Sequence, residues 1–200
     1  AYEATTASVV AGGDVSGFDL YANHVITRSD YGASLDNSEL ATAVGAYIDT
    51  DILYSADGSN NITINGGDEF YIAAGHTFDA SANITMTNME SAGTFNGGSA
   101  TVDINGILLI SGGTYNATSA TTFIEDDFTF TSGTFNANGG TFLFDKTSGG
   151  MAINSGTATL NNVVINKGGA GVGITGTLDI DGDLNINSAW IINGGTINVA

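Results

Sequence analysis

Three aspartates near the C-terminus are the residues whose type and spacing most favour metal binding. Asp179, Asp181 and Asp183 alternate in the run Leu178-Asp-Ile-Asp-Gly-Asp-Leu184. Alternate residues of a strand project from one face, and carboxylate oxygens are the ligands that calcium prefers. The glutamate that completes an EF-hand loop is missing, and so is the tandem Gly-Gly-x-Gly-x-Asp repeat of calcium-binding β-rolls. An acidic turn between two strands explains the same residues, so a calcium site and a plain turn are both open.

Groups suited to acid–base or nucleophilic catalysis are scarce in this chain. Cysteine is absent, which excludes a thiolate nucleophile or thiolate metal ligand. The densest acidic group is Glu125-Asp126-Asp127, but neighbours along a strand point to opposite faces, so a solvated turn is the expected role. The residues that could act as basic partners are few: Arg28, Lys146, Lys167, His24 and His76. We therefore expect no enzymatic activity, and a polysaccharide-active enzyme is the weakest of the function classes considered.

The charge balance restricts the partners. Against 21 acidic residues stand three basic ones, and the net charge is −18. Nucleic acid and anionic membranes call for clustered Lys and Arg, so neither is an expected partner. Two hypotheses explain the excess negative charge. In one, the charge serves only to keep an exported protein soluble; in the other, it prevents assembly until salt or divalent cations screen the charges.

A tetrapeptide repeat sets the architecture. Gly93-Thr-Phe-Asn96 returns at Gly113-Thr-Tyr-Asn116 and Gly133-Thr-Phe-Asn136, each time after 20 residues. Weaker copies start at Gly156, Gly176 and Gly195, after steps of 23, 20 and 19 residues. Each repeat reads as short alternating strands separated by turn residues, and a short fixed period is typical of solenoids. The sequence therefore predicts an all-β fold, a parallel β-solenoid of six to seven coils over residues 55–200.

Aligned repeats predict which residues face inward. One apolar column would contain the third residue of every copy: Phe95, Tyr115, Phe135, Ala158, Leu178 and Ile197. A threonine ladder and an asparagine ladder, the latter of Asn96, Asn116 and Asn136, would run beside it on the outside. A slip of one residue would turn the whole apolar set outward, so the register should be strictly defined.

Residues 1–54 lack the repeat and are predicted to form a separate N-terminal cap or assembly segment. Leu40, Val44, Tyr47 and Ile48 fall at helical spacing, with Ser38 as the expected N-cap. A cap would shield the first coil of the solenoid. The alternative is that the stretch around Val9 and Val10 leaves its own subunit and adds a strand to a neighbour.

The Gly-, Thr- and Asn-rich repeats resemble the β-solenoid repeats of large secreted bacterial surface proteins and adhesins. The resemblance covers about residues 55–200 and is one of architecture. It implies extracellular or cell-surface display, adhesion or matrix formation, and it assigns no functional residue. The chain starts at Ala1 without a charged and apolar leader, so we expect an exported chain whose targeting segment has been removed.

The end of the chain predicts self-association. Residues 195–200 form one strand of a new coil, without a proline or a charged side chain to block its edge. We expect Thr196, Ile197, Asn198 and Val199 to form an assembly interface that docks on the next subunit and yields a filament. The alternative is a monomeric surface adhesin or carbohydrate-binding module cut from a longer protein. Neither hypothesis requires a cofactor or membrane insertion.

Overall fold

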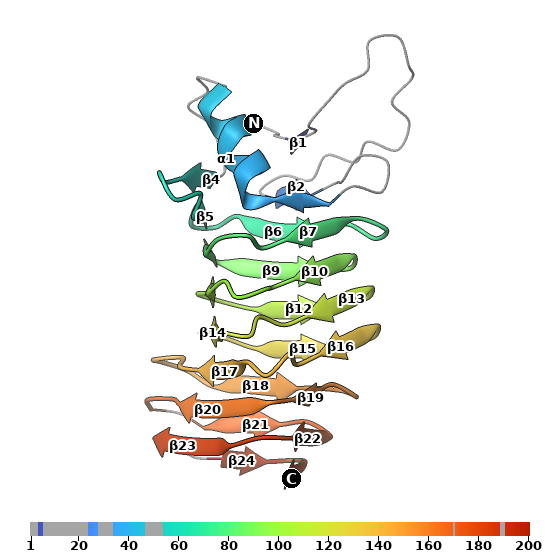
Figure 1. Cartoon of the computed structure of the whole chain (residues 1–200). Coiled ribbons are helices and arrows are strands. Elements are labelled where there is room, and N and C mark those ends of the chain that lie inside the picture. The colour runs from blue at the N-terminus through green and yellow to red at the C-terminus, as the bar shows by residue number, and fades with distance from the viewer. Residues whose placement is uncertain (1–3, 6–23, 28–33, 47–53, 170, 189–190) are drawn as a thin grey trace.

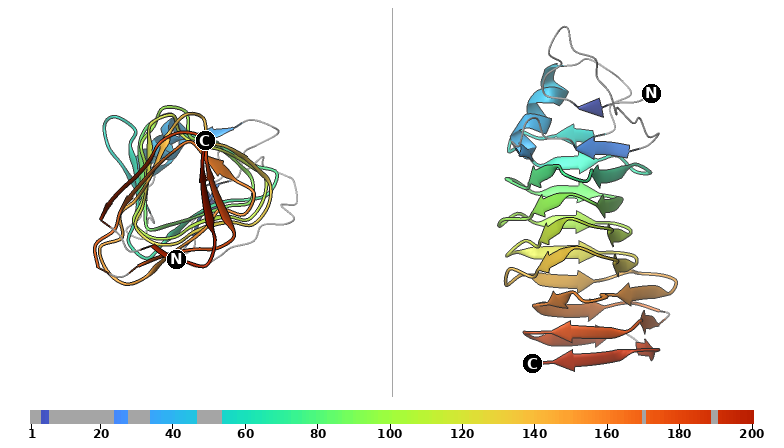
Figure 2. Two further views of the ribbon diagram at one scale, coloured as in Figure 1. Left: turned by 90° about the horizontal axis from the view of Figure 1, so that it is seen from below. Right: turned by 90° about the vertical axis from the view of Figure 1, so that its right-hand side faces the viewer.

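The computed structural model is a β-solenoid of about seven turns, which confirms the predicted fold (Figure 1). It describes residues 4–5, 24–27, 34–46, 54–169, 171–188 and 191–200. Seen along its axis, the coil has a rounded triangular outline, because each full turn contributes one strand to each of three faces (Figure 2).

Two sheets run along most of the stack. Sheet A contains, in spatial order, β1 (Ala4–Thr5), β2 (His24–Thr27), β6 (Glu69–Ile72), β9 (Asn88–Ser91), β12 (Leu108–Ile110), β15 (Phe128–Phe130), β18 (Met151–Asn154), β21 (Val172–Ile174) and β24 (Ile191–Asn193). Sheet C contains β4 (Tyr54–Ala56), β5 (Ile62–Ile64), β8 (Ile84–Met86), β11 (Val102–Ile104), β14 (Thr121–Ile124), β17 (Thr141–Phe144), β20 (Asn162–Asn166) and β23 (Leu184–Ser188).

The third face is divided between two sheets. Sheet B contains β3 (Leu35–Asp36), β7 (Thr77–Asp79), β10 (Thr94–Asn96), β13 (Thr114–Asn116) and β16 (Thr134–Asn136). Sheet D contains β19 (Thr159–Leu160), β22 (Thr177–Ile180) and β25 (Thr196–Val199). All pairings among the described strands are parallel except the hairpin of β4 with β5.

The register follows the repeat. Thr114 pairs with Thr94 and with Thr134, which confirms the predicted threonine ladder over these three coils. Thr177 and Thr196 of the predicted ladder pair in sheet D instead, and Thr157 precedes β19. Tyr115 pairs with Phe95 and Phe135 in the same way, and their rings stack inside the coil with centroid separations of 4.9 and 5.7 Å. Inward aromatic side chains with offset stacking add to the energy of apolar burial. These stacked rings form a continuous part of the hydrophobic core on the inner side of sheet B.

The outward Asn ladder also forms as predicted. The Asn116 Nδ2 donates to Asn96 Oδ1, and the Asn136 Nδ2 donates to Asn116 Oδ1, both at 2.6 Å. Asn96 in turn donates to Asp79 Oδ1 at 2.5 Å. Each asparagine amide therefore donates to the side chain one coil nearer the N-terminus. The ladder begins at Asp79, whose ionised carboxylate accepts a hydrogen bond and has none to donate.

Glycine is required where the corners of successive coils touch. A Cβ on Gly113 would lie 1.9 Å from the carbonyl oxygen of Gly93, and the backbone φ of Gly113 is +62°. The same Gly93 oxygen accepts the N–H of Thr114 at 3.0 Å. The initial residue of the repeat thus lets two backbones meet at a distance that any side chain would prevent.

The predicted single inward column is split, which corrects one expectation. Phe78, Phe95, Tyr115 and Phe135 belong to sheet B, whereas Leu178 pairs with Ile197 in sheet D, and Ala158 precedes β19 of that sheet. The cause lies in β18, where Ile153 rather than Met151 pairs with Phe128. Thr134 follows Phe128 by six positions, but Thr157 follows Ile153 by four, so the chain turns the corner earlier.

Phenylalanines fill the core where the register changes. Phe135, half-buried at the end of sheet B, lies 5.8 Å from Phe142 and 6.0 Å from Phe130 between ring centroids. Phe128 and Phe144 complete this group at 6.2 Å from one another. Large aromatic side chains therefore pack closely against one another in the core where sheet B ends.

The N-terminal segment joins the solenoid in its described parts. Strand β2 pairs with β6 and strand β3 pairs with β7, so the segment continues sheets A and B. Helix α1 (Asn37–Ala46) packs beside β3, β4 and β5. The fully buried Asn37 donates from Nδ2 to the carbonyl oxygens of Asn60, Ala82 and Asn83, each at 3.2 Å. Val9 and Val10 lie outside the described residues.

The predicted helix is present as α1, but its cap is Asp36 and not Ser38; Tyr47 and Ile48 of the predicted pattern lie outside the described residues. Asp36 Oδ1 accepts the Glu39 N–H at 3.0 Å, and Glu39 Oε2 accepts the Asp36 N–H at 3.0 Å. This reciprocal pair is a capping box, and Ser38 only donates its hydroxyl to Asp36 at 2.7 Å. These hydrogen bonds hold the pKa of Asp36 below its usual value against the opposing effect of burial.

Candidate assembly site at the C-terminal coil

The last coil presents three strands with one open edge each. Among the described strands, β23, β24 and β25 are the C-terminal edges of sheets C, A and D. Ile186 of β23 is 42% exposed and Val199 of β25 is 50% exposed, whereas inward residues of the middle coils are fully buried. Open edges beside exposed apolar side chains are the features that promote pairing with another chain.

The hydrogen bonds of β25 determine which of its groups face the open edge. The N–H groups of Thr196 and Ala200 donate to Gly176 O and Ile180 O of the preceding coil, at 2.8 and 2.9 Å. Backbone groups alternate in direction along a strand, so the N–H groups of Ile197 and Val199 point away from β22. The four C-terminal residues of the predicted interface share one strand, in which the N–H groups of Thr196 and Asn198 face their own coil and those of Ile197 and Val199 face the open edge.

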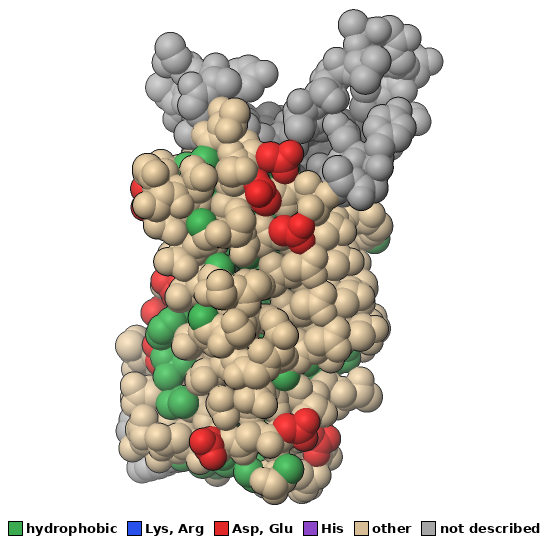
Figure 3. Space-filling view, in the orientation of Figure 1, with side chains coloured by type: hydrophobic (Ala, Val, Ile, Leu, Met, Phe, Trp, Pro, Cys, Tyr) green, Lys and Arg blue, Asp and Glu red, His purple; other side chains and the backbone are tan. Residues whose placement is uncertain are grey.

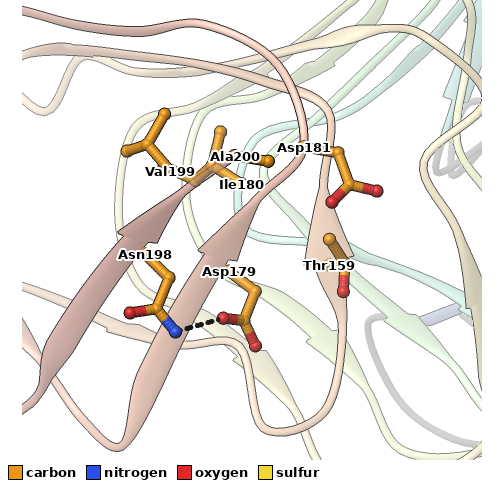
Figure 4. Close-up of a pocket in the computed structure, with 7 residues that line it drawn as sticks. All are labelled: Thr159, Asp179, Ile180, Asp181, Asn198, Val199 and Ala200. Carbon is orange, nitrogen blue, oxygen red and sulfur yellow. Dashed lines mark hydrogen bonds between the residues drawn. The ribbon is translucent and has the colours of Figure 1, made fainter.

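A pocket with a mixed polar and apolar lining lies at the C-terminal ends of β22 and β25 (Figure 4). Asn198 Nδ2 donates to Asp179 Oδ1 at 2.8 Å, as one step of an Asp-to-Asn ladder like that of sheet B. The full lining consists of Thr159, Asp179, Ile180, Asp181, Asn198, Val199 and Ala200. The ladder here was not expected from the sequence, because this copy of the repeat has Asp179 in place of asparagine.

The three C-terminal aspartates are only partly brought together. Asp179 and Asp181 line the pocket, whereas the backbone N–H of Asp183 donates to Asn162 Oδ1 at the next corner. Within the described ranges, no three His, Cys, Asp or Glu side chains are grouped so that they could hold a metal ion. Calcium at these residues stays a prediction.

The acidic run at residues 125–127 forms a corner between β14 and β15. Asp126 makes an ion pair with Lys146 of the next coil, and Asp127 Oδ1 accepts the Ala152 N–H at 2.7 Å. These contacts link successive coils, in agreement with a structural turn. Their partial exposure implies a modest contribution to stability.

A second acidic group, missed in the sequence, lies on the outside of sheet C. Burial raises the pKa of Asp145, and the charges of Glu125 and Asp103 raise it further. One of its carboxylate oxygens, Oδ1, is buried without a hydrogen-bond partner in the described part of the chain. Burial likewise raises the pKa of Asp103, against a hydrogen bond from Thr85. The 20-residue spacing of Glu125 and Asp145 is the signal that could have revealed this stacking.

Comparison with protein families, curated proteins and solved structures gave no match to this chain. The described residues include no helix with the length and apolar character needed to cross a membrane.

Proposed function

We propose that this chain is an exported structural subunit that assembles head to tail into a filament. The C-terminal coil of one copy docks on the N-terminal end of the next, and the stack of strands continues through the junction. No cofactor and no chemical step take part. Such a heterologous contact produces an open polymer unless its rotation closes a ring.

The observation that carries this proposal is the matching polarity of the two ends of sheet A. The sheet begins at β1, which pairs in parallel with β2, and ends at β24, which pairs in parallel with β21. A second copy placed below the first can therefore offer β1 to β24 in the same parallel direction. The N-terminal edge of sheet B is β3, which is also parallel to its neighbour but lies in the coil of β2, one strand level farther from the junction than β1. Sheet A is therefore the face that can continue at one strand spacing.

Charge explains how such an assembly would be controlled. Each copy has a net charge of −18, and Asp179 and Asp181 line the pocket beside β25 at the C-terminal end. Approach of two such ends is opposed at low ionic strength and favoured when salt screens the charges, over a Debye length of about 10 Å at 0.1 M. Filament formation is thus expected to rise with salt concentration.

The second candidate is a monomeric surface adhesin or carbohydrate-binding module. It is favoured by the many outward threonine and asparagine side chains, whose hydroxyl and amide groups can both donate and accept hydrogen bonds to sugars. In that case the open edges would be covered by further coils of a longer protein.

The discriminating experiment uses a proline at Val199. The Val199 N–H faces the open edge, so Val199→Pro removes a docking donor and leaves the bonds of Thr196 and Ala200 to β22 in place. Val199→Ala keeps the N–H and is the matched control. Negative-stain microscopy at 0.5 M salt should show filaments for wild type and Val199→Ala, and isolated particles for Val199→Pro. Monodisperse particles of the wild-type chain under every salt condition would favour the adhesin.

A further inference from the structure

The outer face of sheet B carries no charge over three consecutive coils. We call this surface the neutral face and define it by the outward residues of β10, β13 and β16: Thr94, Asn96, Thr114, Asn116, Thr134 and Asn136. The stretches that form these strands and their corners, residues 91–102, 111–124 and 128–144, contain no Asp, Glu, Lys or Arg. On the side of the molecule drawn in Figure 3, acidic side chains lie at both ends and along the left edge, and none lies in the right-hand middle.

The side chains of the neutral face are held in fixed positions. The asparagines hydrogen-bond to one another at 2.6 Å, and the threonines are β-branched and stacked in register. Little conformational entropy is then lost when a partner binds, because the surface is already ordered. The face is a preorganised array with the period of the coil, about 4.7–4.9 Å.

We infer that the neutral face packs laterally against the same face of a second copy. Like charges juxtaposed across an interface oppose binding, and each copy has a net charge of −18. Outward carboxylates lie elsewhere: Asp79 on β7 at the N-terminal end of sheet B, Glu69 and Glu90 on sheet A, Asp103 on sheet C and Asp179 on sheet D. Strands β12, β15 and β18 of sheet A are also uncharged, but the corner that leads into β15 carries Glu125, Asp126 and Asp127, whereas the corners on both sides of the neutral face carry no charge. The neutral face is where two such copies approach with the least repulsion.

Periodicity favours the same partner. A second copy presents threonine and asparagine ladders with an identical strand spacing, so contacts repeat from coil to coil once one pair is aligned. A two-fold axis makes such an interface self-complementary. A sugar chain gains much of its affinity from aromatic stacking, and here the rings of Phe95, Tyr115 and Phe135 point into the core.

The small area of the neutral face limits the strength of the lateral contact between two subunits. Three strands of three residues span roughly 14 by 10 Å, so face and corners cover a few hundred Å² at most, below the roughly 800 Å² per partner of stable complexes. A single pair of subunits therefore binds weakly. Along a filament the contact repeats at every subunit, and the summed affinity joins filaments into bundles. This bundling rests on the proposed head-to-tail assembly, whereas the weak pairing of single subunits does not.

The test compares Thr134→Glu with Thr129→Glu. Thr134 is exposed on the neutral face, and Thr129 is an outward threonine of β15 on the neighbouring sheet A. Far-UV circular dichroism with thermal melting checks that both variants fold. Sedimentation velocity across a concentration series measures pairing of unassembled chains, and microscopy counts filaments per bundle. We expect pairing to weaken about tenfold or more for Thr134→Glu, with bundles separating into single filaments, and to change less than twofold for Thr129→Glu.

The outcomes separate the two proposals. Single wild-type filaments without pairing would overturn the lateral contact and leave head-to-tail assembly standing. Pairs of subunits without filaments would do the reverse. Equal effects of the two variants would refute the assignment to the neutral face. Binding of wild type, but not Thr134→Glu, to insoluble cellulose without self-association would show that the face takes a neutral polysaccharide and would also overturn the inference.

Discussion

Replacing Gly113 with alanine should destabilise the solenoid far more than the same change at Gly139. Both glycines have positive φ, +62° and +76°, but no atom lies within 4 Å of a Cβ on Gly139. Alanine in this backbone region costs roughly 1–2 kcal/mol, of which about 0.4–1 returns through the stiffer unfolded chain. Gly139→Ala should therefore lose about 1 kcal/mol. It is the matched control for backbone strain alone.

At Gly113 a steric term is added. A Cβ there would lie 1.9 Å from Gly93 O, so the two coils must separate locally. Overpacking of this kind costs about 1–3 kcal/mol, and weakening of the Thr114 N–H bond to Gly93 O adds about 1 kcal/mol. The expected loss is about 3–5 kcal/mol in the free energy of unfolding. Guanidinium titration followed by far-UV circular dichroism measures both variants. Losses that agree within about 0.5 kcal/mol would refute the claim that close coil contact, rather than backbone angle, requires glycine here.

Three further predictions concern single side chains. The hydroxyls of Tyr115 and Thr122 are neighbours in the core. Among the described residues neither has a partner in good hydrogen-bond geometry, so any contact between the two hydroxyls is weak. Tyr115→Phe with Thr122→Val removes both hydroxyls and should keep the free energy of unfolding or raise it by about 1 kcal/mol, and a loss above about 1 kcal/mol in denaturant titration would contradict this. Asn116→Asp should cost about 1–3 kcal/mol at pH 7, because a carboxylate cannot donate to Asn96, and the deficit relative to wild type should shrink below about pH 4, where a protonated carboxyl donates again. A deficit that does not change with pH would exclude that explanation. The raised pKa of Asp145 means that the folded state binds the carboxyl proton more tightly than the unfolded state, so ionisation of Asp145 destabilises the fold as pH rises. Asp145→Asn should therefore have a higher melting temperature than wild type at pH 7, and this difference should disappear as pH falls toward 3.8. An equal difference in melting temperature at both pH values would disprove the effect.

The repeat made most of the fold predictable. The initial glycine, the outward threonine, the inward aromatic residue and the outward asparagine each have one role at one register position, so a period of 20 residues defines strand, face and ladder together. Local pattern and global stacking agree over residues 93–136. Such agreement is what allows a sequence to specify one structure.

The remaining features depend on contacts between segments far apart in the chain. The two-residue change in pairing at β18 divides one face into sheets B and D, and the step from Gly133 to Gly156 alone did not say where the extra residues go. The N-cap is Asp36 rather than the predicted Ser38, because β3 ends at Asp36 and α1 begins at the next residue. Asp179 and Asp183 alternate in sequence, yet a corner separates them, since Gly182 lies between β22 and β23.

The axial rise per subunit of a filament, measured by cryo-electron microscopy, tests head-to-tail assembly most directly. The described part of sheet A contributes nine strands per copy, and a continuous stack at about 4.7–4.9 Å per strand predicts a rise of about 42–44 Å, with β24 of one subunit one strand spacing from β1 of the next. A rise in this range with unbroken strand spacing at the junction is the expected result. A filament whose subunits meet through their sides, with β24 left unpaired, would contradict the account.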